Sequence, residues 1–326
     1  MAATHLHTSA LRRPVGYSPG AAEQLWKGDT TGRNCELLER MLQGDGIRAA
    51  LHYTSLAHGA NTALPTAAQS DVLSKIDWGH GCLELLEPLT GATRHPFHIY
   101  SGCKLSLARR SLAHYYDITY LQLVNGCPAA TSCETGAVRL NRTASARNLL
   151  YDLGCSNYVD SGKLRVTGGY GSSIPLFRRL YARNCIEFDA IWGWEASPKN
   201  LSKWWAKVPK ELQPRLTFYN EPVNDTNALD VLLATARPED FVVMKIDIDT
   251  PPLEDRIMHR ILSEPSIAAL IDELYFEFDP KLGSSPVHVN DSMVEGRGKN
   301  RLGPIDKGLH LMKSLRVQGI RSHFWV

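Results

Sequence analysis

The chain lacks any long apolar run, although 43% of its 326 residues are hydrophobic. No stretch approaches the roughly 20 consecutive apolar residues that a membrane-spanning helix requires. The chain also lacks an excess of charge, because 36 Lys and Arg stand against 34 Asp and Glu, for a net charge of +2. Nucleic-acid-binding proteins usually carry a clustered basic surface, so this balance argues against such a partner. A globular protein remains, large enough for one or two domains with an ordinary core.

Zinc-binding spacing is missing as well. The seven cysteines form no Cys-x-x-Cys pair and the histidines no His-x-x-x-His pair, so no structural zinc site is predicted. Cys127 and Cys133 flank a turn-rich segment. They are either free buried thiols or the two halves of a disulfide that closes this loop.

A signal peptide is also missing, since the first 30 residues contain no apolar core. Four Asn-x-Ser/Thr triplets nevertheless fit the N-glycosylation pattern, beginning at Asn141, Asn200, Asn224 and Asn290. A secretory (Golgi) lumen is therefore expected if the chain is a piece of a longer protein, and the cytoplasm otherwise.

From about residue 146 the chain alternates short apolar runs with amphipathic segments. The runs predict strands at 148–153, 186–192, 216–219, 241–248, 273–278 and 320–326. Helices are predicted at 174–184, 254–262 and about 305–315. This alternation is typical of β-α-β units, and it predicts an α/β fold with a Rossmann-like, doubly wound, mostly parallel sheet covered on both faces.

Residues 1–145 show shorter and more mixed signals. Helices are predicted at 35–43 and 105–115, and a strand at 118–124. The sequence therefore predicts two parts, with residues 1–145 as an arm and a mixed α/β cap or substrate region, and residues 146–326 as the domain with the parallel sheet.

Polar and glycine residues follow strand after strand in the second part. Ligands of open α/β sheets bind at the carboxyl ends of the strands, beside the point where the strand order reverses. Glycine turns let a backbone approach a ligand closely, and an acid after the second strand is placed to bind a ribose. Each signal alone is as readily an ordinary turn or helix cap, but together they predict a nucleotide site. The residues are Asp152, Gly154, Ser156, Gly169, Gly171, Glu195, Asn220, Asp247, Asp249, Glu277 and Asp279.

In this order, the segments YDLGCS, GYGSS, FYNEPVNDTNALDVLLA, FVVMKIDID and ELYFEFDP resemble the FkbM-like S-adenosylmethionine-dependent methyltransferases. The resemblance covers roughly residues 146–326, and KIDID and FYNEPV are its most specific parts. It implies the seven-stranded methyltransferase variant of the doubly wound sheet. The implied reaction is the transfer of a methyl group from S-adenosylmethionine to an oxygen of a small molecule or sugar.

The resemblance also implies roles for individual residues. Asp152, Gly154 and Gly171 would line the methionine part of the cofactor, and Ser156 and Gly169 in the same two turns are expected to join them. Glu195 would bind the ribose hydroxyls, Asn220 would lie near the adenine, and Asp247 would face the reacting centre. The sequence departs from the family in two respects. Residues 158–167 separate two turns that are usually one compact motif, and only one strand is predicted after the fifth, where the family's fold normally adds a two-strand closing element.

A hydroxyl acceptor needs a base or a metal ion to remove its proton. Asp247 and His288 are the candidate bases, although a histidine in the loop after the fifth strand can equally be a solvent-exposed residue. Asp247, Asp249 and Asp279 are the candidate oxygen ligands for Mg²⁺ or Mn²⁺. Alternate side chains of a strand share a face, so Asp247 and Asp249 are expected to open together onto the ligand crevice.

Two other functions fit parts of the sequence. A metal-dependent glycosyltransferase would use the acids of Asp247-Ile248-Asp249 to hold Mn²⁺ against a nucleotide-sugar diphosphate, and glycosylation triplets would suit its compartment. A methyltransferase fold that has lost catalysis and serves only as a binding protein is the third reading, because the glycine motif is interrupted.

Overall fold

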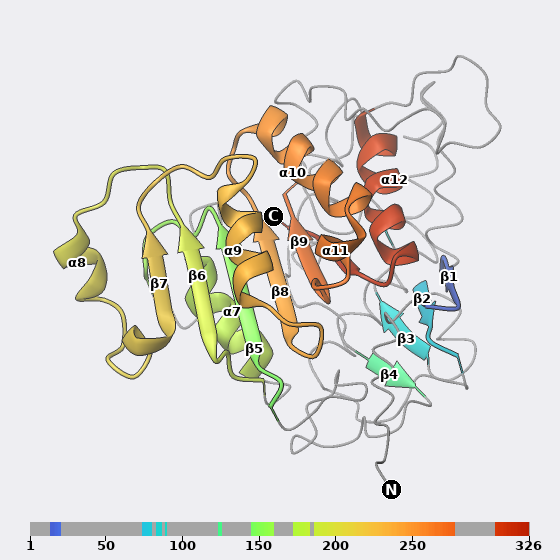
Figure 1. Ribbon diagram of the computed structural model, residues 1–326, viewed down its shortest axis with the longest axis horizontal. Coiled ribbons are helices and arrows are strands. Elements are labelled where there is room, and N and C mark those ends of the chain that lie inside the picture. Colours follow the sequence, from blue (N-terminus) through green and yellow to red (C-terminus); the bar gives the residue numbers. More distant parts are fainter. Residues whose placement is uncertain are drawn as a thin grey trace, which may run out of the picture.

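The computed structural model describes residues 14–20, 74–79, 83–86, 89, 123–125, 145–159, 172–182, 186–277 and 304–325. Figure 1 shows two sheets in these residues, a parallel one of six strands and an antiparallel one of four. The helices predicted at 35–43 and 105–115 lie outside the described residues. No helix within the described ranges is long and apolar enough to cross a membrane.

The parallel sheet is built from the second part of the chain. Its strands are β5 (Asn148–Leu153), β6 (Ala190–Trp194), β7 (Leu216–Tyr219), β8 (Phe241–Ile246), β9 (Glu273–Phe276) and β10 (Arg321–Phe324). Their order in space is β10-β9-β8-β5-β6-β7, and every neighbouring pair is parallel. Counted along the chain, this is the 3-2-1-4-5-6 order of a doubly wound sheet. The predicted α/β class is confirmed.

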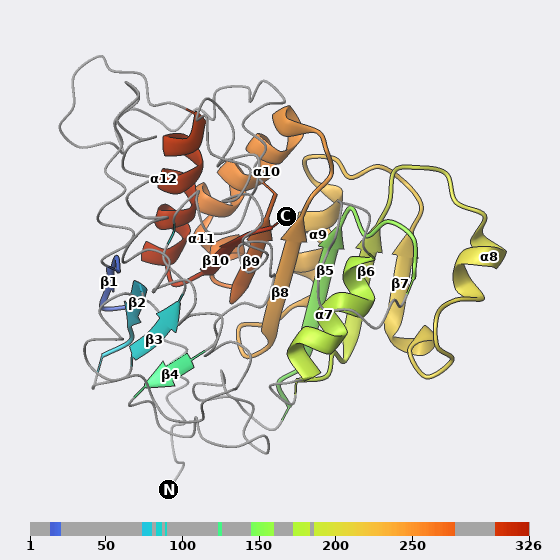
Figure 2. The same ribbon diagram turned by 180° about the vertical axis from the view of Figure 1, so that it is seen from behind.

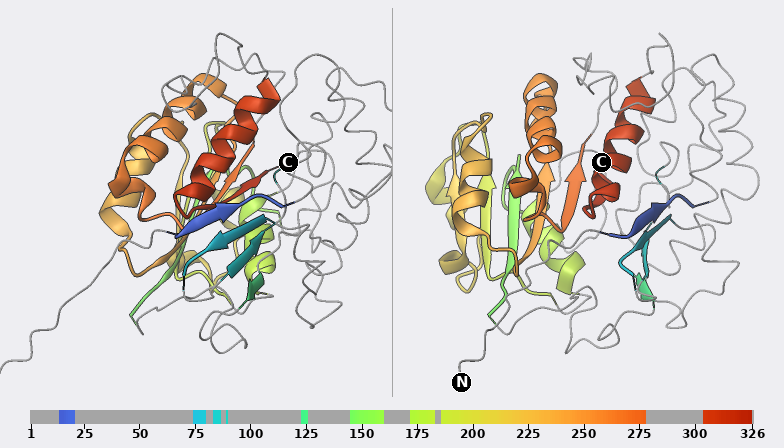
Figure 3. Two further views of the ribbon diagram at one scale, coloured as in Figure 1. Left: turned by 90° about the vertical axis from the view of Figure 1, so that its right-hand side faces the viewer. Right: turned by 45° about the vertical axis from the view of Figure 1, so that its right-hand side comes forward.

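Helices cover both faces of this sheet, as Figures 2 and 3 show. The α7 helix (Ser173–Ala182) lies on one face. On the other face lie α9 (Asn227–Thr235), α10 (Pro251–Ser263), the short α11 (Pro265–Ala268) and α12 (Pro304–Val317). The α8 helix (Leu201–Trp205) and a 3-10 turn (Gln213–Arg215) lie beside the β7 edge.

Each face of the sheet has its own core. Ile174, Phe177 and Tyr181 of α7 follow the spacing of one helix face and pack on the first side. Ile257 of α10 and Met312 of α12 pack on the second. Because both faces are covered, β5 and β8 are buried over their whole length, which explains their continuous apolar runs.

Some predicted boundaries move for physical reasons. The run at 186–192 enters the sheet only at Ala190, because β5 begins at Asn148 and leaves residues 186–188 no partner strand to pair with. The α10 helix begins at Pro251 rather than at residue 254, since proline is tolerated in the first helical turn. The sheet has six strands in the described residues instead of the seven implied by the resemblance, and β10 pairs directly with β9.

A small antiparallel sheet precedes this body in the chain. It contains β1 (Gly16–Ser18), β2 (Ser74–Asp77), β3 (Leu83–Leu86) and β4 (Leu123–Asn125), paired in that order. β1 lies beside α12 (Figure 3), and the guanidinium carbon of Arg316 lies 5.9 Å from the centre of the Tyr17 ring. The predicted division of the chain at residue 145 stays a prediction.

Candidate functional site

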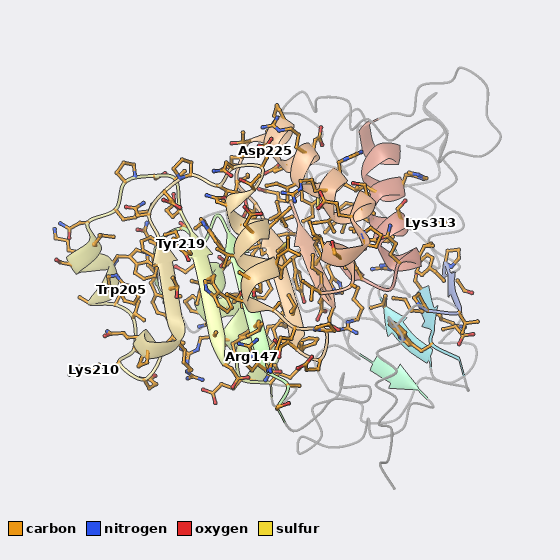
Figure 4. All side chains as sticks on the ribbon, viewed as in Figure 1. Arg147, Trp205, Lys210, Tyr219, Asp225 and Lys313 are labelled. Atoms are coloured by element: carbon orange, nitrogen blue, oxygen red, sulfur yellow. The ribbon has the colours of Figure 1, made fainter. Side chains whose placement is uncertain are left out.

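The strand order reverses between β5 and β8, so the polypeptide leaves these two neighbouring strands toward opposite sides of the sheet. Such a point opens a crevice at the carboxyl ends of the strands. Figure 4 shows Tyr219 and Asp225 toward this carboxyl edge and Arg147 at the opposite, amino edge. The predicted strand-end residues that the structure describes follow the carboxyl ends of β5 to β9 and therefore lie along this edge.

Strand register places a row of polar side chains across the middle of the sheet. Asp152 of β5 pairs with Lys245 of β8, which pairs with Tyr275 of β9, which pairs with His323 of β10. All four are less than 2% exposed. Ser173 at the start of α7 donates a hydrogen bond to Asp152, so this row lies on the α7 face of the sheet.

A second row lies two residues farther along, at the carboxyl edge. The backbone ladder continues past the strands, because the amides of Asp247, Glu277 and Trp325 still donate to the preceding strands, at 3.0, 3.0 and 2.8 Å. Alternation therefore puts these three side chains on the same face as Lys245. Gly154 occupies the equivalent place after β5.

Lys245 is the centre of the site. Its ammonium Nζ lies 2.9 Å from the Gly154 carbonyl oxygen, 2.9 Å from Asp247 Oδ2 and 3.4 Å from Asp152 Oδ1. Burial by itself would lower the pKa of this ammonium, but the carboxylates of Asp247 and Asp152 outweigh it and raise the pKa above its ordinary value. Lys245 therefore carries a fixed positive charge.

Asp152, predicted to line the cofactor, is completely buried. Burial raises the pKa of its carboxyl, against the attraction of Lys245 and the hydrogen bond from Ser173. Its contacts join the end of β5 to the beginning of α7 and to β8. The Asp152 side chain therefore stabilises the strand end that leads into the turn at Gly154.

The Gly154 turn requires glycine. Its φ is +87°, and a Cβ built on it would lie 1.6 Å from the carbonyl oxygen of Asp247. The backbone after β5 therefore touches the backbone after β8, at a distance that no side chain permits. Ser156, two residues on, also has a positive φ of 58°, and its carbonyl accepts a hydrogen bond from Trp204 Nε1 at 3.2 Å.

Glu195 and Asn220 lie at the ends of β6 and β7, as predicted, and both are held by local hydrogen bonds. Glu195 Oε1 accepts from the Ser197 amide at 2.7 Å and lies 3.7 Å from Lys199 Nζ. Asn220 donates to the carbonyls of Glu195 and Ser197, and accepts from the Lys199 amide at 2.7 Å. Because both the nitrogen and the oxygen of its side-chain amide are hydrogen-bonded within the protein, Asn220 holds the loop that carries Glu195.

Three acids meet on the other side of the reversal point. One carboxylate oxygen each from Asp247, Asp249 and Glu277 lies within 4.8 Å of the others. We call these three residues the acidic cluster. Burial and the hydrogen bond to Asp247 raise the pKa of Glu277 to about 9. Glu277 is therefore protonated at neutral pH and donates to Asp247.

Asp247 stays ionised in this cluster. Burial opposes its charge, but Lys245 and the hydrogen bonds from Glu277 and Trp325 lower its pKa below the ordinary value. Trp325 Nε1 donates to Asp247 Oδ2 at 3.0 Å, the same oxygen that pairs with Lys245. Lys245 and Trp325 thus both bond to Oδ2 of Asp247, and Oδ1 is left for contacts within the acidic cluster.

Asp247 and Asp249 lie close together, as predicted, but the expected reason, that alternate side chains of one strand share a face, is wrong. The strand ends at Ile246, so both acids follow it, and Asp249 has a left-handed φ of 51°. A turn, instead of strand alternation, accompanies the approach of the two carboxylates. Glu254 of α10 lies beside them, with its pKa raised to about 7 by burial.

Several predicted site residues lie outside the described residues: Gly169, Gly171, His288 and Asp279, together with Cys127 and Cys133. The sequence interpretation in turn missed Lys245, Trp325 and Glu254. Lys245 could have been recognised from its place inside the otherwise apolar run FVVMKI. A lysine in a buried strand requires acidic partners, so it marks a charged site. Nothing local marks the other two.

Comparison of the chain with protein-family models, curated proteins and solved structures found no match. The site itself is therefore the basis for assigning a function.

Proposed function

We propose that this chain is an S-adenosylmethionine-dependent methyltransferase that acts on a hydroxyl of a small molecule or sugar. The observation that carries the proposal is the contact between the Gly154 turn and the carbonyl of Asp247. A glycine turn after the first strand is where a doubly wound sheet brings its backbone against a nucleotide. A methyl donor bound there would lie beside the acidic cluster.

Glu195 supports the nucleoside half of this proposal. It ends the strand next to β5, and its carboxylate is oriented by the Ser197 amide and Lys199. An acid at this place suits two ribose hydroxyls, which donate hydrogen bonds to it. Asn220 would contribute indirectly, through the loop it holds.

The acidic cluster supports the transfer half. Methyl transfer is an in-line displacement in which the acceptor oxygen attacks the methyl carbon, the carbon–sulfur bond breaks and S-adenosylhomocysteine leaves. The hydroxyl proton must go to a base, and Asp247 is ionised and held in place by Lys245 and Trp325. Asp247 is the proposed proton acceptor, and the site would orient the two reactants in line.

A metal-assisted version uses the same residues. Asp247, Asp249 and Glu277 offer the hard oxygen ligands that Mg²⁺ and Mn²⁺ prefer. A divalent cation bound there would lower the pKa of a coordinated acceptor hydroxyl. Lys245 already pairs with one oxygen of Asp247, so this carboxylate would offer the cation its other oxygen.

A metal-dependent glycosyltransferase is the second candidate. The proximity of the Asp247 and Asp249 carboxylates favours it, because an Asp-x-Asp pair of this kind can hold Mn²⁺ against a diphosphate. It gives no role to the Gly154 turn or to Glu195, which a methyl donor's nucleoside uses. A binding protein without catalysis would retain the Gly154 turn and lack turnover.

Calorimetry of the purified chain separates these functions. We expect binding of S-adenosylmethionine and S-adenosylhomocysteine without added metal, and no binding of UDP in the presence of Mn²⁺. The reverse pattern would favour the glycosyltransferase. Binding of neither ligand would remove both.

A matched pair of variants tests the predicted cofactor contact. Glu195→Ala should weaken S-adenosylhomocysteine binding by about 1.5–3 kcal/mol, the range for a lost charge-assisted hydrogen bond. Glu187→Ala removes an acid that is paired with Arg215 at the amino edge and precedes the same strand, so it should leave binding unchanged. Equal affinity of both variants would exclude Glu195 from the site.

Turnover tests the base once an acceptor is identified. Asp247→Asn keeps the size of the side chain and removes its charge. It should lower turnover by roughly 10²-fold or more while cofactor affinity stays within several-fold. Activity that rises with Mg²⁺ or Mn²⁺ and falls with chelator would favour the metal-assisted version, and a fully active variant would refute both versions.

A further inference from the structure

Lys245 is a charged residue in a strand that is buried along its whole length. Its side chain is 1% exposed, and its neighbours in β8 are all apolar. A buried ammonium is costly unless each of its donors meets an oxygen. The identity of those oxygens therefore indicates what the lysine is there to hold.

The ammonium of Lys245 donates hydrogen bonds to the Gly154 carbonyl and to Asp247, with a longer contact to the Leu153 carbonyl at 3.5 Å, and it forms an ion pair with Asp152 at 3.4 Å. Asp152 belongs to β5, the carbonyl of Gly154 to the turn after β5, and Asp247 to the turn after β8. A single acid would neutralise the charge of a lysine. The additional bond to the Gly154 carbonyl fixes the backbone orientation of a turn that has no side chain of its own.

The two turns contribute to different halves of the proposed reaction. The Gly154 turn would bind the methyl donor, and Asp247 would take the acceptor's proton. They also touch directly through the Asp247 carbonyl. A group bonded to both turns sets their separation and therefore the alignment of donor and base.

We propose that Lys245 is the positioning residue of this site, which holds the cofactor-binding turn at Gly154 and the carboxylate of Asp247 in one fixed arrangement. The inference rests on the proposed methyl transfer for its chemical meaning. The linkage between the two turns is a physical statement that is testable without any ligand.

The test compares two variants that differ only at Lys245. Lys245→Met alone would leave the carboxylate of Asp152 buried without a cation, which by itself strongly destabilises the fold. Asp152→Asn removes this charge first and leaves Lys245 bonded to both turns. The informative comparison is between Asp152→Asn and the double variant Asp152→Asn, Lys245→Met.

Amide hydrogen exchange is the first measurement, with S-adenosylhomocysteine affinity as the second. In the double variant the amides of residues 154–158 and 247–250 should exchange at least about tenfold faster than in Asp152→Asn, and the two segments should change together. Exchange in β9 and β10 should stay the same, whereas a residue that only stabilised the whole domain would raise exchange throughout. Affinity for S-adenosylhomocysteine should fall by at least about tenfold relative to Asp152→Asn.

Trp325 provides a spectroscopic readout and Tyr275→Phe a control. The indole Nε1–H of Trp325 is bonded to Asp247, so its nuclear magnetic resonance signal should shift in the double variant. Tyr275 is as buried as Lys245 in the same row, and its hydroxyl bonds Tyr181 instead of either turn. Tyr275→Phe should leave amide exchange in residues 154–158 and 247–250, and the Trp325 signal, unchanged.

The outcomes separate this inference from the proposed function. Equal exchange of the two turns with and without Lys245 would overturn the inference, and wild-type binding of S-adenosylhomocysteine would then leave the proposed function standing. If the wild-type chain does not bind S-adenosylhomocysteine, the proposed function fails. Joint loss of protection in the two turns would still support the linkage by Lys245.

Discussion

Acidic residues have different partners at the two edges of the parallel sheet. At the amino edge each of three aspartates accepts a hydrogen bond from a backbone amide near the start of β5 or β8. The pairs are Asp189 with Asn148, Asp240 with Arg147 and Asp272 with Val242, at 2.6, 2.9 and 2.8 Å. These acids bond to groups that a strand would otherwise leave unpaired.

At the carboxyl edge the acids face one another. Asp247, Asp249 and Glu277 converge, and burial together with the hydrogen bond to Asp247 keeps Glu277 protonated. Like charges placed together lower stability unless a ligand or a reaction uses them. The comparison therefore separates acids that pair with backbone amides, at one edge, from acids that face one another and that the proposed reaction would use, at the other.

Gly154→Ala should produce the largest loss of stability, because it disturbs the contact that builds the carboxyl edge. The positive φ costs roughly 1–3 kcal/mol and the overlap with the Asp247 carbonyl a similar amount, for a total of about 2–6 kcal/mol. Urea unfolding measures the difference. Gly193→Ala is the control, since its Cβ would meet only the side chains of Cys155 and Ile174, at 3.0 and 3.2 Å. A larger loss for Gly193→Ala would contradict the central place of Gly154.

Neutralising an acid at the amino edge should also destabilise the chain. Burial opposes the charge of Asp240, but Arg147 and the Arg237 amide lower its pKa below the ordinary value. A lowered pKa gives stability that is present above the unfolded pKa, near 3.9, and is lost as the pH falls through the folded one. Asp240→Asn should cost about 2–3 kcal/mol at pH 7 in urea unfolding. The difference from wild type should shrink toward pH 3, and a constant difference would argue against the ion pair.

Neutralising an acid at the carboxyl edge should have the opposite sign. The pKa of Glu277 is raised from 4.5 to about 9, so the folded chain holds a proton that the unfolded chain releases at pH 7. Stability from this group is complete below about pH 4.5 and falls as the pH rises toward 9. Glu277→Gln still donates to Asp247 without binding a titratable proton, and should raise stability at pH 7 by about 1–2 kcal/mol.

The pH series supplies the control for Glu277→Gln. The gain should disappear below about pH 4, where the wild-type carboxyl is protonated in both states. Destabilisation at pH 7 would mean that the acidic cluster is not crowded in the free protein, and the contrast between the two edges would fail.

The contrast explains which parts of the molecule were predictable from the sequence. β5 and β7 were predicted at 148–153 and 216–219, as they are found, and β8 and α12 came close. Burial on both faces produces the continuous apolar runs of β5 and β8, and packing of one face produces the helical spacing of α12. The gathering of strand-end residues at one edge also followed from the α/β class alone. These features depend on periodicity, which a sequence displays directly.

The state of each side chain at that edge was not predictable in this way. The engagement of Asn220 with the Glu195 loop depends on the path of the backbone between residues 195 and 199. The role of Lys245 depends on the register of β5 against β8 and on the turn at Gly154. Pairing register and turn path are set by tertiary packing, and no local pattern encodes them.

The β6–α8 loop gives a case in which a motif has a simpler structural explanation. Asn200 begins one of the four glycosylation triplets, and it is also the N-cap of α8. Its Oδ1 accepts a hydrogen bond from the Lys203 amide at 3.0 Å. Asn224 is used similarly, because its Oδ1 accepts from the amides of Thr226 and Asn227 before α9. A helix cap therefore accounts for Asn200, and the turn that leads into α9 accounts for Asn224, without a glycan.

Two substitutions that destroy the same triplet distinguish the cap from the glycan, and their effect should be the smallest of this series. Asn200→Ala removes the cap and should cost about 1 kcal/mol. Ser202→Ala removes the triplet but keeps the cap, and an exposed serine away from the capping bond should cost less than about 0.5 kcal/mol. Urea unfolding of protein made in a host that adds no glycan isolates the cap, because any difference between the variants then comes from the polypeptide alone. Equal losses of unfolding free energy in the two variants would mean that the bond from the Lys203 amide to Asn200 contributes nothing to stability. The presence of Asn200 in this loop would then need an explanation other than the fold, as the acids of the carboxyl edge do.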